Sequence, residues 1–178
     1  PPYGRYGVGV VFSPKDKRLR EECRAIFSRC AEKLGLDILL WRKVPVNTVG
    51  IGATALSVEP EIEQVFVACP DHITDPVEFE RKLFVLRNYA SHLIQSTVKQ
   101  DTIGFYIASL SYKTVVYKGQ LTSLQVRGYF PDLGNKHLVS AFGLVHSRFA
   151  TNTFPSWKLA QPFRYIAHNG EINTLQGN

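Results

Sequence analysis

Apolar and polar positions along this chain follow two periods, and the shorter period predicts strands. Runs of β-branched and aromatic residues, bounded by Gly, Pro, Ser or Asp, are typical of strands in a half-buried or buried sheet. The predicted strands are Tyr6–Phe12, Asp37–Val44, Ile62–Ala68, Phe105–Leu110, Thr114–Tyr117, Val139–Phe149 and Tyr165–His168. The turn residues Ser111–Lys113 predict that the fourth and fifth of these strands form a hairpin.

The longer period, 3.6 residues, predicts a first helix. Ser13 is expected as its N-cap and Pro14 as its first residue, and Gly35 is expected to end it just after Leu34. Its inward face would consist of Leu19, Cys23, Ile26, Phe27, Cys30 and Leu34.

A second long helix is predicted from Pro76 to about Lys99. Asp75 is expected as its N-cap, with Glu78 completing a capping box. Its inward face would consist of Phe79, Leu83, Leu86, Ala90 and Leu93.

The rest of the chain has weaker patterns. Asn47–Glu59 lacks a clear period and is predicted to be a loop, Leu121–Tyr129 is a short helix or an irregular link, and a helix begins near Glu171. The resulting order, β-α-β-β-α-β-β-β-β, contains more strands than crossover helices. An α+β class with mixed or antiparallel sheets and helices stacked on them therefore fits better than a parallel doubly wound sheet.

Length and composition fit one globular domain, or most of one. The chain has 178 residues, of which 44% are hydrophobic and 20% charged. It has no run of about 18 apolar residues and no signal-peptide pattern, so no membrane association is expected. The net charge is +6. Basic residues concentrate in residues 15–29, on the first helix, where acidic neighbours favour a solvated face over a nucleic-acid surface.

The three cysteines give no sign of metal binding. Cys23 and Cys30 lie on one face of the first helix and are expected to be buried apolar residues, and Cys69 stands apart from them. No zinc-ligand spacing is present. Unpaired, scattered cysteines fit a reducing, cytoplasmic compartment.

The stretch from His146 to Asn178 carries the candidate chemistry. Arg148 follows an apolar run, where its planar guanidinium group could bind a carboxylate in two places; a structural salt bridge is the alternative. His146 and His168 could act as acid or base, or serve as hydrogen-bonded framework residues.

Asn169 and Gly170 form a second candidate group. An Asn-Gly pair after a strand is commonly a turn. A strand-to-helix turn with an amide side chain and a free Gly N–H could instead hold an oxyanion. Glu171 would then be an acidic residue in the first turn of the helix. Spacing alone leaves both interpretations open.

Three motifs in this stretch resemble those of a known family. The motifs are HSRFATNT, WKLAQP and HNGEINT. They occur in the same order as in the glutaminase domain of glutamate synthases, which resembles this chain and belongs to the class II glutamine amidotransferases. Four upstream pieces extend the resemblance to nearly the whole chain. They are WRKVPVN, EIEQVFV, FYIASLS and VYKG.

The resemblance implies roles for residues in the motifs. Arg148 would bind the α-carboxylate of glutamine, with Phe149 and Thr151 lining the same pocket. The Asn169 side chain and the Gly170 backbone N–H would form the oxyanion hole. The family's usual Ser beside the Arg is replaced here by Ala150, and Asn173 would order the turn.

One departure from the family is large. Its nucleophile is a Cys at the mature N-terminus, whose own α-amine serves as the base, whereas this chain begins with Pro1. Residues 1–178 are therefore expected to be an internal part of the glutaminase domain, an incomplete α-β-β-α sandwich of the N-terminal-nucleophile-hydrolase type. The fragment alone is expected to be inactive.

In the parent enzyme, the resemblance implies hydrolysis of glutamine to glutamate and ammonia, with reductive transfer to 2-oxoglutarate. FMN and an iron–sulfur cluster would lie in other domains, none of these cofactors would bind this chain, and a small electron-donating subunit is the expected partner. The electron donor itself stays open. The alternatives are a non-catalytic glutamine-binding or partner-binding module, another class II amidotransferase, and a basic RNA-binding domain. The last lacks the exposed aromatic pairs that such domains use.

Overall fold

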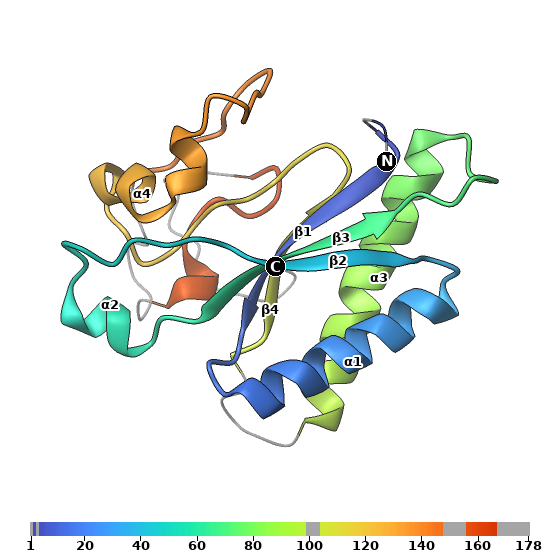
Figure 1. Ribbon diagram of the computed structural model, residues 1–178, viewed down its shortest axis with the longest axis horizontal. Coiled ribbons are helices and arrows are strands. Elements are labelled where there is room, and N and C mark those ends of the chain that lie inside the picture. Colours follow the sequence, from blue (N-terminus) through green and yellow to red (C-terminus); the bar gives the residue numbers. More distant parts are fainter. Residues whose placement is uncertain (1, 3, 99–103, 148–155, 167–178) are drawn as a thin grey trace. The chain divides into compact units, whose positions relative to one another are not determined.

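The computed structural model describes Pro2 and residues 4–98, 104–147 and 156–166. The chain divides into two compact units, each built from two segments (Figure 1). The first contains residues 1–43 and 60–115, and the second contains residues 44–59 and 116–178. We refer to them as the sheet unit and the motif unit.

The sheet unit is built on one antiparallel sheet in the order β2-β3-β1-β4. Its strands are β1 (Tyr6–Ser13), β2 (Ile38–Lys43), β3 (Glu61–Ala68) and β4 (Tyr106–Ser111). The predicted strands in these four places are confirmed, and so is the expectation of a mixed or antiparallel sheet. An irregularity in the β1–β4 register lies between Val10 and Val11.

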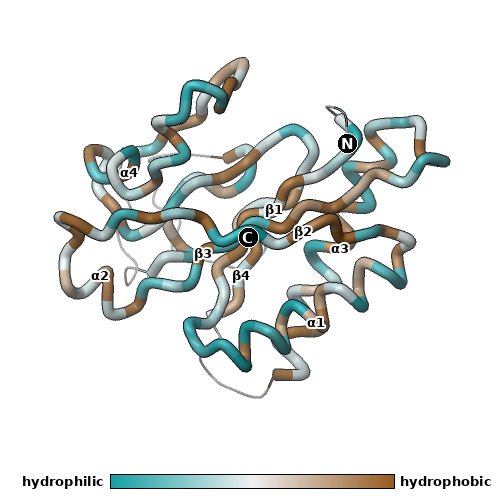
Figure 2. Tube along the Cα trace, in the orientation of Figure 1, coloured by the Kyte–Doolittle hydropathy of each residue, from teal (hydrophilic) through white to brown (hydrophobic). Residues whose placement is uncertain are grey.

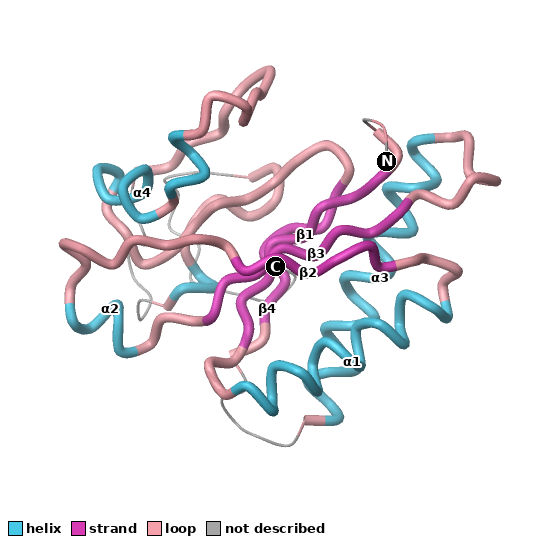
Figure 3. The backbone as a smooth tube through the Cα atoms, in the orientation of Figure 1, coloured by secondary structure: helices cyan, strands magenta, loops and turns pink. Residues whose placement is uncertain are grey.

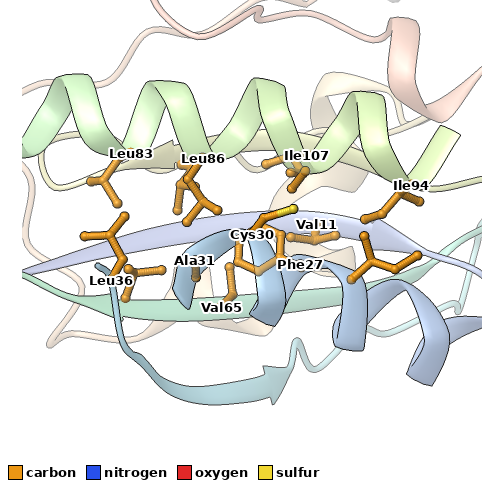
Figure 4. Packing of buried hydrophobic residues seen from close by; sticks show 14 of the residues in the cluster. Val11, Phe27, Cys30, Ala31, Leu36, Val65, Leu83, Leu86, Ile94 and Ile107 are labelled. Atoms are coloured by element: carbon orange, nitrogen blue, oxygen red, sulfur yellow. The ribbon is translucent and has the colours of Figure 1, made fainter. Parts of the chain in front are cut away.

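Two long helices, α1 (Lys17–Lys33) and α3 (Pro76–Thr97), pack on the same face of this sheet (Figure 1). Figure 4 shows α3 side chains Leu83, Leu86 and Ile94 directed toward α1 and the sheet. They form one core cluster with Phe27 and Cys30 of α1 and with strand residues Val11, Val65 and Ile107. The predicted inward faces of both helices are confirmed; Leu19, Leu34 and Leu93 pack at the cluster's margin.

Two glycines allow close packing around β1. A Cβ on Gly7 would lie 2.5 Å from Leu83 Cδ1, and one on Gly9 would lie 2.7 Å from Val65 Cγ1. Any larger side chain at these positions would displace the Leu83 or Val65 side chain, which gives a packing reason for the two glycines.

The predicted start of the first helix is wrong by a few residues. Asp16 caps α1 by accepting a 2.9 Å hydrogen bond from the Leu19 N–H. Ser13 still belongs to β1, and its hydroxyl donates instead to the buried carboxylate of Glu63 at 2.7 Å. The predicted N-cap of α3 is confirmed, since Asp75 accepts from the Val77 N–H at 2.9 Å. The capping box with Glu78 stays a prediction.

The predicted second strand of the 105–117 hairpin is absent, since Thr114–Tyr117 is not a strand. Side chains satisfy the backbone donors that a hairpin would have used. The Ser111 hydroxyl accepts from the N–H groups of Lys113 and Thr114, and Glu80 accepts from the Tyr112 N–H. Meanwhile β4 pairs with β1 instead.

The motif unit contains short helices: α2 (Ala53–Ser57), α4 (Ser123–Tyr129), and the 3-10 turns η1 (Pro131–Gly134) and η2 (Trp157–Leu159). Figure 3 shows that loops make up most of its described chain. The loop prediction for Asn47–Glu59 missed α2, which has no buried residue of its own and therefore no apolar period. At Leu121–Tyr129 the structure selects the helical alternative.

Two other strand predictions in the motif unit are wrong over their described parts. Val139–Ser147 forms no strand, and most of its large apolar side chains are exposed. Tyr165 and Ile166 belong to a turn closed by paired Phe163–Ile166 hydrogen bonds, so no strand begins at Tyr165. The remainders of both predicted strands, and the helix near Glu171, lie outside the described residues.

The helices in the described part of the chain are short, or long and amphipathic. The mixed colouring of α1 and α3 in Figure 2 shows their amphipathic character. None of them combines the length and the apolar character needed to cross a bilayer.

Candidate functional site

All five residues assigned to the site lie outside the described residues. They are Arg148, Phe149, Thr151, Asn169 and Gly170. His168 lies outside them too, whereas His146 is half-buried within them. The structure describes the segment between the two groups, residues 156–166, and its supports in the motif unit. This segment includes the WKLAQP motif.

Trp157 anchors the start of the segment. It is 4% exposed, its indole N–H donates to the Ala55 carbonyl at 3.0 Å, and its ring lies 5.5 Å from that of Tyr129. A buried Trp that both packs and donates is fixed in position and in orientation.

Gly119 fits against the face of Trp157. A Cβ at this glycine would lie 2.3 Å from Cζ3 of the indole, so only glycine leaves room for the ring. The VYKG piece of the sequence and the WKLAQP motif are therefore packed against one another. This contact gives a physical reason for the glycine at the end of VYKG.

A tight turn ends the described part of the segment. Phe163 and Ile166 exchange two backbone hydrogen bonds of 2.8 Å, leaving Arg164 and Tyr165 at the tip. Arg164 has φ of 51°, a left-handed conformation that costs a residue with a side chain roughly 1 to 3 kcal/mol. The surrounding bonds hold the turn in spite of this strain.

Two aromatic residues at the end of α4, earlier in the chain, support Trp157. Tyr129 and Phe130 are both 1% exposed, and their rings meet edge-on at 4.7 Å. The Tyr129 hydroxyl donates to Glu59 at 2.6 Å, and its carbonyl accepts from the Asn47 N–H at 2.8 Å. The end of α4 thereby joins the 44–59 segment to the segment carrying the motif.

The cysteines in the sheet unit are unsuited to nucleophilic catalysis. Cys23 and Cys30 are fully buried on α1. Burial raises the pKa of the Cys23 thiol from 9.0 to about 11, with the nearby Glu22 carboxylate adding to the shift. Burial also raises the pKa of Cys30. Since the thiolate is the reactive form, both are structural, as the helical spacing predicted.

Sequence reasoning missed two contributors to this region. Ala55 acts only through its backbone carbonyl, so its residue type carries no signal. Lys118 is 2% exposed, although lysine is rarely buried. The position of Lys118 between two apolar residues and a glycine in VYKG was the one available hint.

Comparison with known proteins identifies the class to which this arrangement belongs. Residues 1–178 match the family model described as Glutamine amidotransferases class-II. The chain belongs to this family.

The relatives are large enzymes of one kind. The chain is 50% identical to "Glutamate synthase [NADH]" of Schizosaccharomyces pombe, covering 100% of this chain and 8% of the relative. It is 46% identical to "Glutamate synthase [NADPH] large chain" of Bacillus subtilis, covering 98% and 11%. It is 43% identical to "Ferredoxin-dependent glutamate synthase 2, chloroplastic" of Arabidopsis thaliana, covering 97% and 10%. The chain thus spans about a tenth of the length of these relatives.

Proposed function

We propose that these residues are part of the glutamine-hydrolysing domain of a glutamate synthase. The supporting observation is that HSRFATNT, WKLAQP and HNGEINT stand in one chain that matches relatives of this name over 97% to 100% of its length. The reaction is hydrolysis of glutamine to glutamate and ammonia, and the ammonia is then transferred reductively to 2-oxoglutarate.

Arg148 binds the α-carboxylate of glutamine in this proposal. Its guanidinium group offers paired N–H donors that match a carboxylate in geometry and charge. Phe149 and Thr151, its near neighbours in the sequence, line the same pocket. An Arg–carboxylate clamp favours free glutamine over a glutamine residue inside a peptide, because the α-carboxylate of an internal residue has been converted to an amide.

Asn169 and Gly170 stabilise the tetrahedral intermediate. Attack on the side-chain amide of glutamine places a negative charge on its oxygen. The Asn169 amide and the Gly170 backbone N–H each donate a hydrogen bond to this oxygen, which lowers the barrier most where water is excluded.

We propose that the nucleophile lies in a part of the parent enzyme other than these residues. The family uses an N-terminal Cys with its own α-amine as base, and Cys23, Cys30 and Cys69 are all buried thiols within α1 or just after β3. Residues 1–178 would then form part of the domain and not all of it.

The finer architecture proposed is half of an α-β-β-α sandwich. The support is that the sheet is apolar on the face turned away from α1 and α3 as well. By the strand register, Val8, Phe12, Ile62 and Phe66 lie on that face. Sheets with apolar side chains on both faces are covered on both.

Electron transfer belongs elsewhere in the parent enzyme. We propose that FMN and an iron–sulfur cluster lie in its other domains and that a small subunit supplies electrons in some members. The three unpaired cysteines fit a reducing compartment such as the cytoplasm or a plastid. The relatives are named for three different electron donors, NADH, NADPH and ferredoxin.

The decisive test is Arg148→Ala in the full-length parent enzyme. Glutamine-dependent glutamate synthesis should fall by at least about 100-fold, since losing a charge-assisted bidentate Arg–carboxylate pair costs several kcal/mol. Synthesis from free ammonia should stay within about twofold. Arg127→Ala, at an exposed position on α4, is the matched control. Equal loss of both reactions in the Arg148 variant would refute the assigned role.

A second experiment tests the location of the nucleophile. The isolated 178-residue chain should release no ammonia from glutamine above the rate of a buffer blank. A rate comparable with that of the parent enzyme would show that these residues contain a complete active site.

A further inference from the structure

Lys118 is a buried cation in the motif unit. Only 2% of its surface is exposed, which is rare for lysine because removing an ammonium group from water is unfavourable unless it is well paired. Tyr117 before it and Gly119 after it both pack against aromatic rings. A lysine retained in such surroundings is held there by specific interactions.

Two of those interactions reach opposite ends of the segment that carries WKLAQP. The Lys118 ammonium donates to the Lys158 carbonyl at 2.9 Å, within the η2 turn. It also lies 4.4 Å from the centroid of the Phe163 ring, which is within the range of a cation–π interaction. Lys158 lies at the start of the segment and Phe163 at the tight turn that ends it, so one side chain connects both.

The neighbouring contacts act on the same segment. Gly119 packs against the Trp157 ring, and Trp157 donates to Ala55. Lys118 is thus the charged member of a small set of contacts that fix residues 157–163 in one conformation. A buried charge is sensitive to geometry, because its free energy rises steeply when its partners move away.

The place of this segment in the sequence gives the contacts a functional consequence. HSRFATNT ends at Thr153, shortly before Trp157, and Asn169 follows Ile166 by three residues. The segment is therefore the link between the proposed carboxylate-binding motif and the proposed oxyanion motif. A displacement of about 1 Å in such a site can lower a rate by roughly 100-fold.

From these contacts we infer that Lys118 is a positioning residue of the glutaminase reaction. It acts through the Lys158 carbonyl and the Phe163 ring, which set the position of the link between the two motifs, and it does not touch glutamine. The inference rests on the proposed function and adds a residue and a mode of action to it.

The test uses the full-length parent enzyme and the substitution Lys118→Met. Methionine has an unbranched side chain of similar length but no ammonium group. The kcat and KM for glutamine, the rate with free ammonia and the melting temperature are measured together. We expect kcat/KM for glutamine to fall about tenfold or more, while the ammonia-dependent rate changes less than about twofold. Lys136→Met, at an exposed lysine of the same unit, should leave all four quantities unchanged.

A second variant covers the case in which Lys118→Met does not fold. Phe163→Leu keeps an apolar side chain and removes the ring face that the ammonium contacts, so a smaller, glutamine-specific loss of about threefold is expected. A purely structural Lys118 would lower the melting temperature and both rates together. Unchanged glutamine kinetics in both variants, or parallel loss of the glutamine and ammonia reactions, would overturn the inference.

Failure of this inference can be told apart from failure of the proposed function. If the proposed function is wrong, the unaltered parent enzyme releases no ammonia from glutamine, or Arg148→Ala has no glutamine-specific effect. If only the role of Lys118 is wrong, those two results stand, and the Lys118 and Phe163 variants either behave like the unaltered enzyme or lose the glutamine and ammonia reactions in parallel.

Discussion

The sheet unit and the motif unit of this chain are held together in different ways. In the sheet unit, repeating elements bury one continuous cluster between two helices and a sheet. In the motif unit, the described chain is mostly loop (Figure 3). Individual hydrogen bonds and ring contacts join segments far apart in the sequence. Regular elements give a rigid scaffold, whereas loops can present the particular groups that chemistry needs.

Both units contain contacts between distant residues, such as the β1–β4 pairing, but those of the motif unit are made by single side chains. Trp157 bonds to a residue 102 positions away, Gln125 to one 75 away and Tyr129 to one 70 away. Each of these contacts joins the 44–59 segment to a later part of the motif unit. The region around the candidate site therefore depends on a few pairs, and the loss of one pair has no periodic neighbour to compensate for it.

The chain offers a direct way to follow each unit, because it contains two tryptophans. Trp41 lies on β2 in the sheet unit, and Trp157 lies in the motif unit. Replacing one of them with Phe leaves the other as a fluorescence reporter, so that urea unfolding of the 178-residue chain can be measured for each unit.

Removing a core side chain from α3 should produce the largest effect. Leu86 is fully buried in the cluster, so Leu86→Ala should lower the free energy of unfolding reported by Trp41 by about 2 to 5 kcal/mol. Val85→Ala, at a neighbouring residue that is 46% exposed, should change it by less than about 0.5 kcal/mol. Similar losses in the two variants would contradict the core described for the sheet unit.

Raising the pH should destabilise the sheet unit through Cys23. The unfolded thiol ionises near 9.0, whereas burial raises its pKa in the folded chain to about 11. The stabilisation from the neutral thiol is complete below the unfolded pKa and is lost as the pH rises through this window. The loss should be on the order of 2 kcal/mol.

Urea titrations reported by Trp41 at several alkaline pH values measure this loss. The substitution Cys23→Ala should make the dependence on pH shallower. Ser28→Ala, at an exposed position on the same helix, should leave it unchanged. An equally steep dependence in the Cys23 variant would exclude this thiol as its source.

Deleting one hydroxyl should weaken the motif unit alone. The Tyr129 hydroxyl donates to Glu59 at 2.6 Å, and hydrogen bonds to charged groups contribute about 1.5 to 3 kcal/mol. Tyr129→Phe should therefore lower the stability reported by Trp157 by about 1.5 kcal/mol, with no change at Trp41. Tyr165→Phe, at a residue 53% exposed, is the control. A matching loss at Trp41 would mean that the two units unfold as one.

The smallest predicted effect is at a helix cap in the sheet unit. Asp16 accepts a 2.9 Å hydrogen bond from the Leu19 N–H, so Asp16→Ala should cost about 1 kcal/mol at Trp41. Glu21→Ala removes only an exposed pair with Lys17 at 3.9 Å and should cost less than about 0.5 kcal/mol. Reversal of this order would place the helix start elsewhere, for example at Ser13.

Most of the sheet unit could be predicted because its signals are local. A period of two residues marked the strands, and a period of 3.6 marked the inward faces of α1 and α3. The helix start was misplaced because Ser13 and Asp16 are both good caps, and the choice depended on Glu63, a residue 50 positions away that binds Ser13. Local pattern contains no information about such a partner.

The motif unit could be predicted much less well. Thr114–Tyr117 and Val139–Ser147 have residues typical of strands, but a strand also needs a partner, and the described chain provides none there. The residues assigned to catalysis and substrate binding came from the motifs and not from physical pattern, and their roles stay predictions.

By itself, the sequence determined the periodic elements of the scaffold, the burial of Cys23 and Cys30, and the motifs that match class II glutamine amidotransferases. Only the tertiary structure decided that Lys118 is buried and that Trp157 is held by Gly119 and Ala55. The physical reason is that periodicity is a property of neighbouring residues, whereas the free energy of a buried charge or indole N–H depends on partners that the fold brings from distant positions.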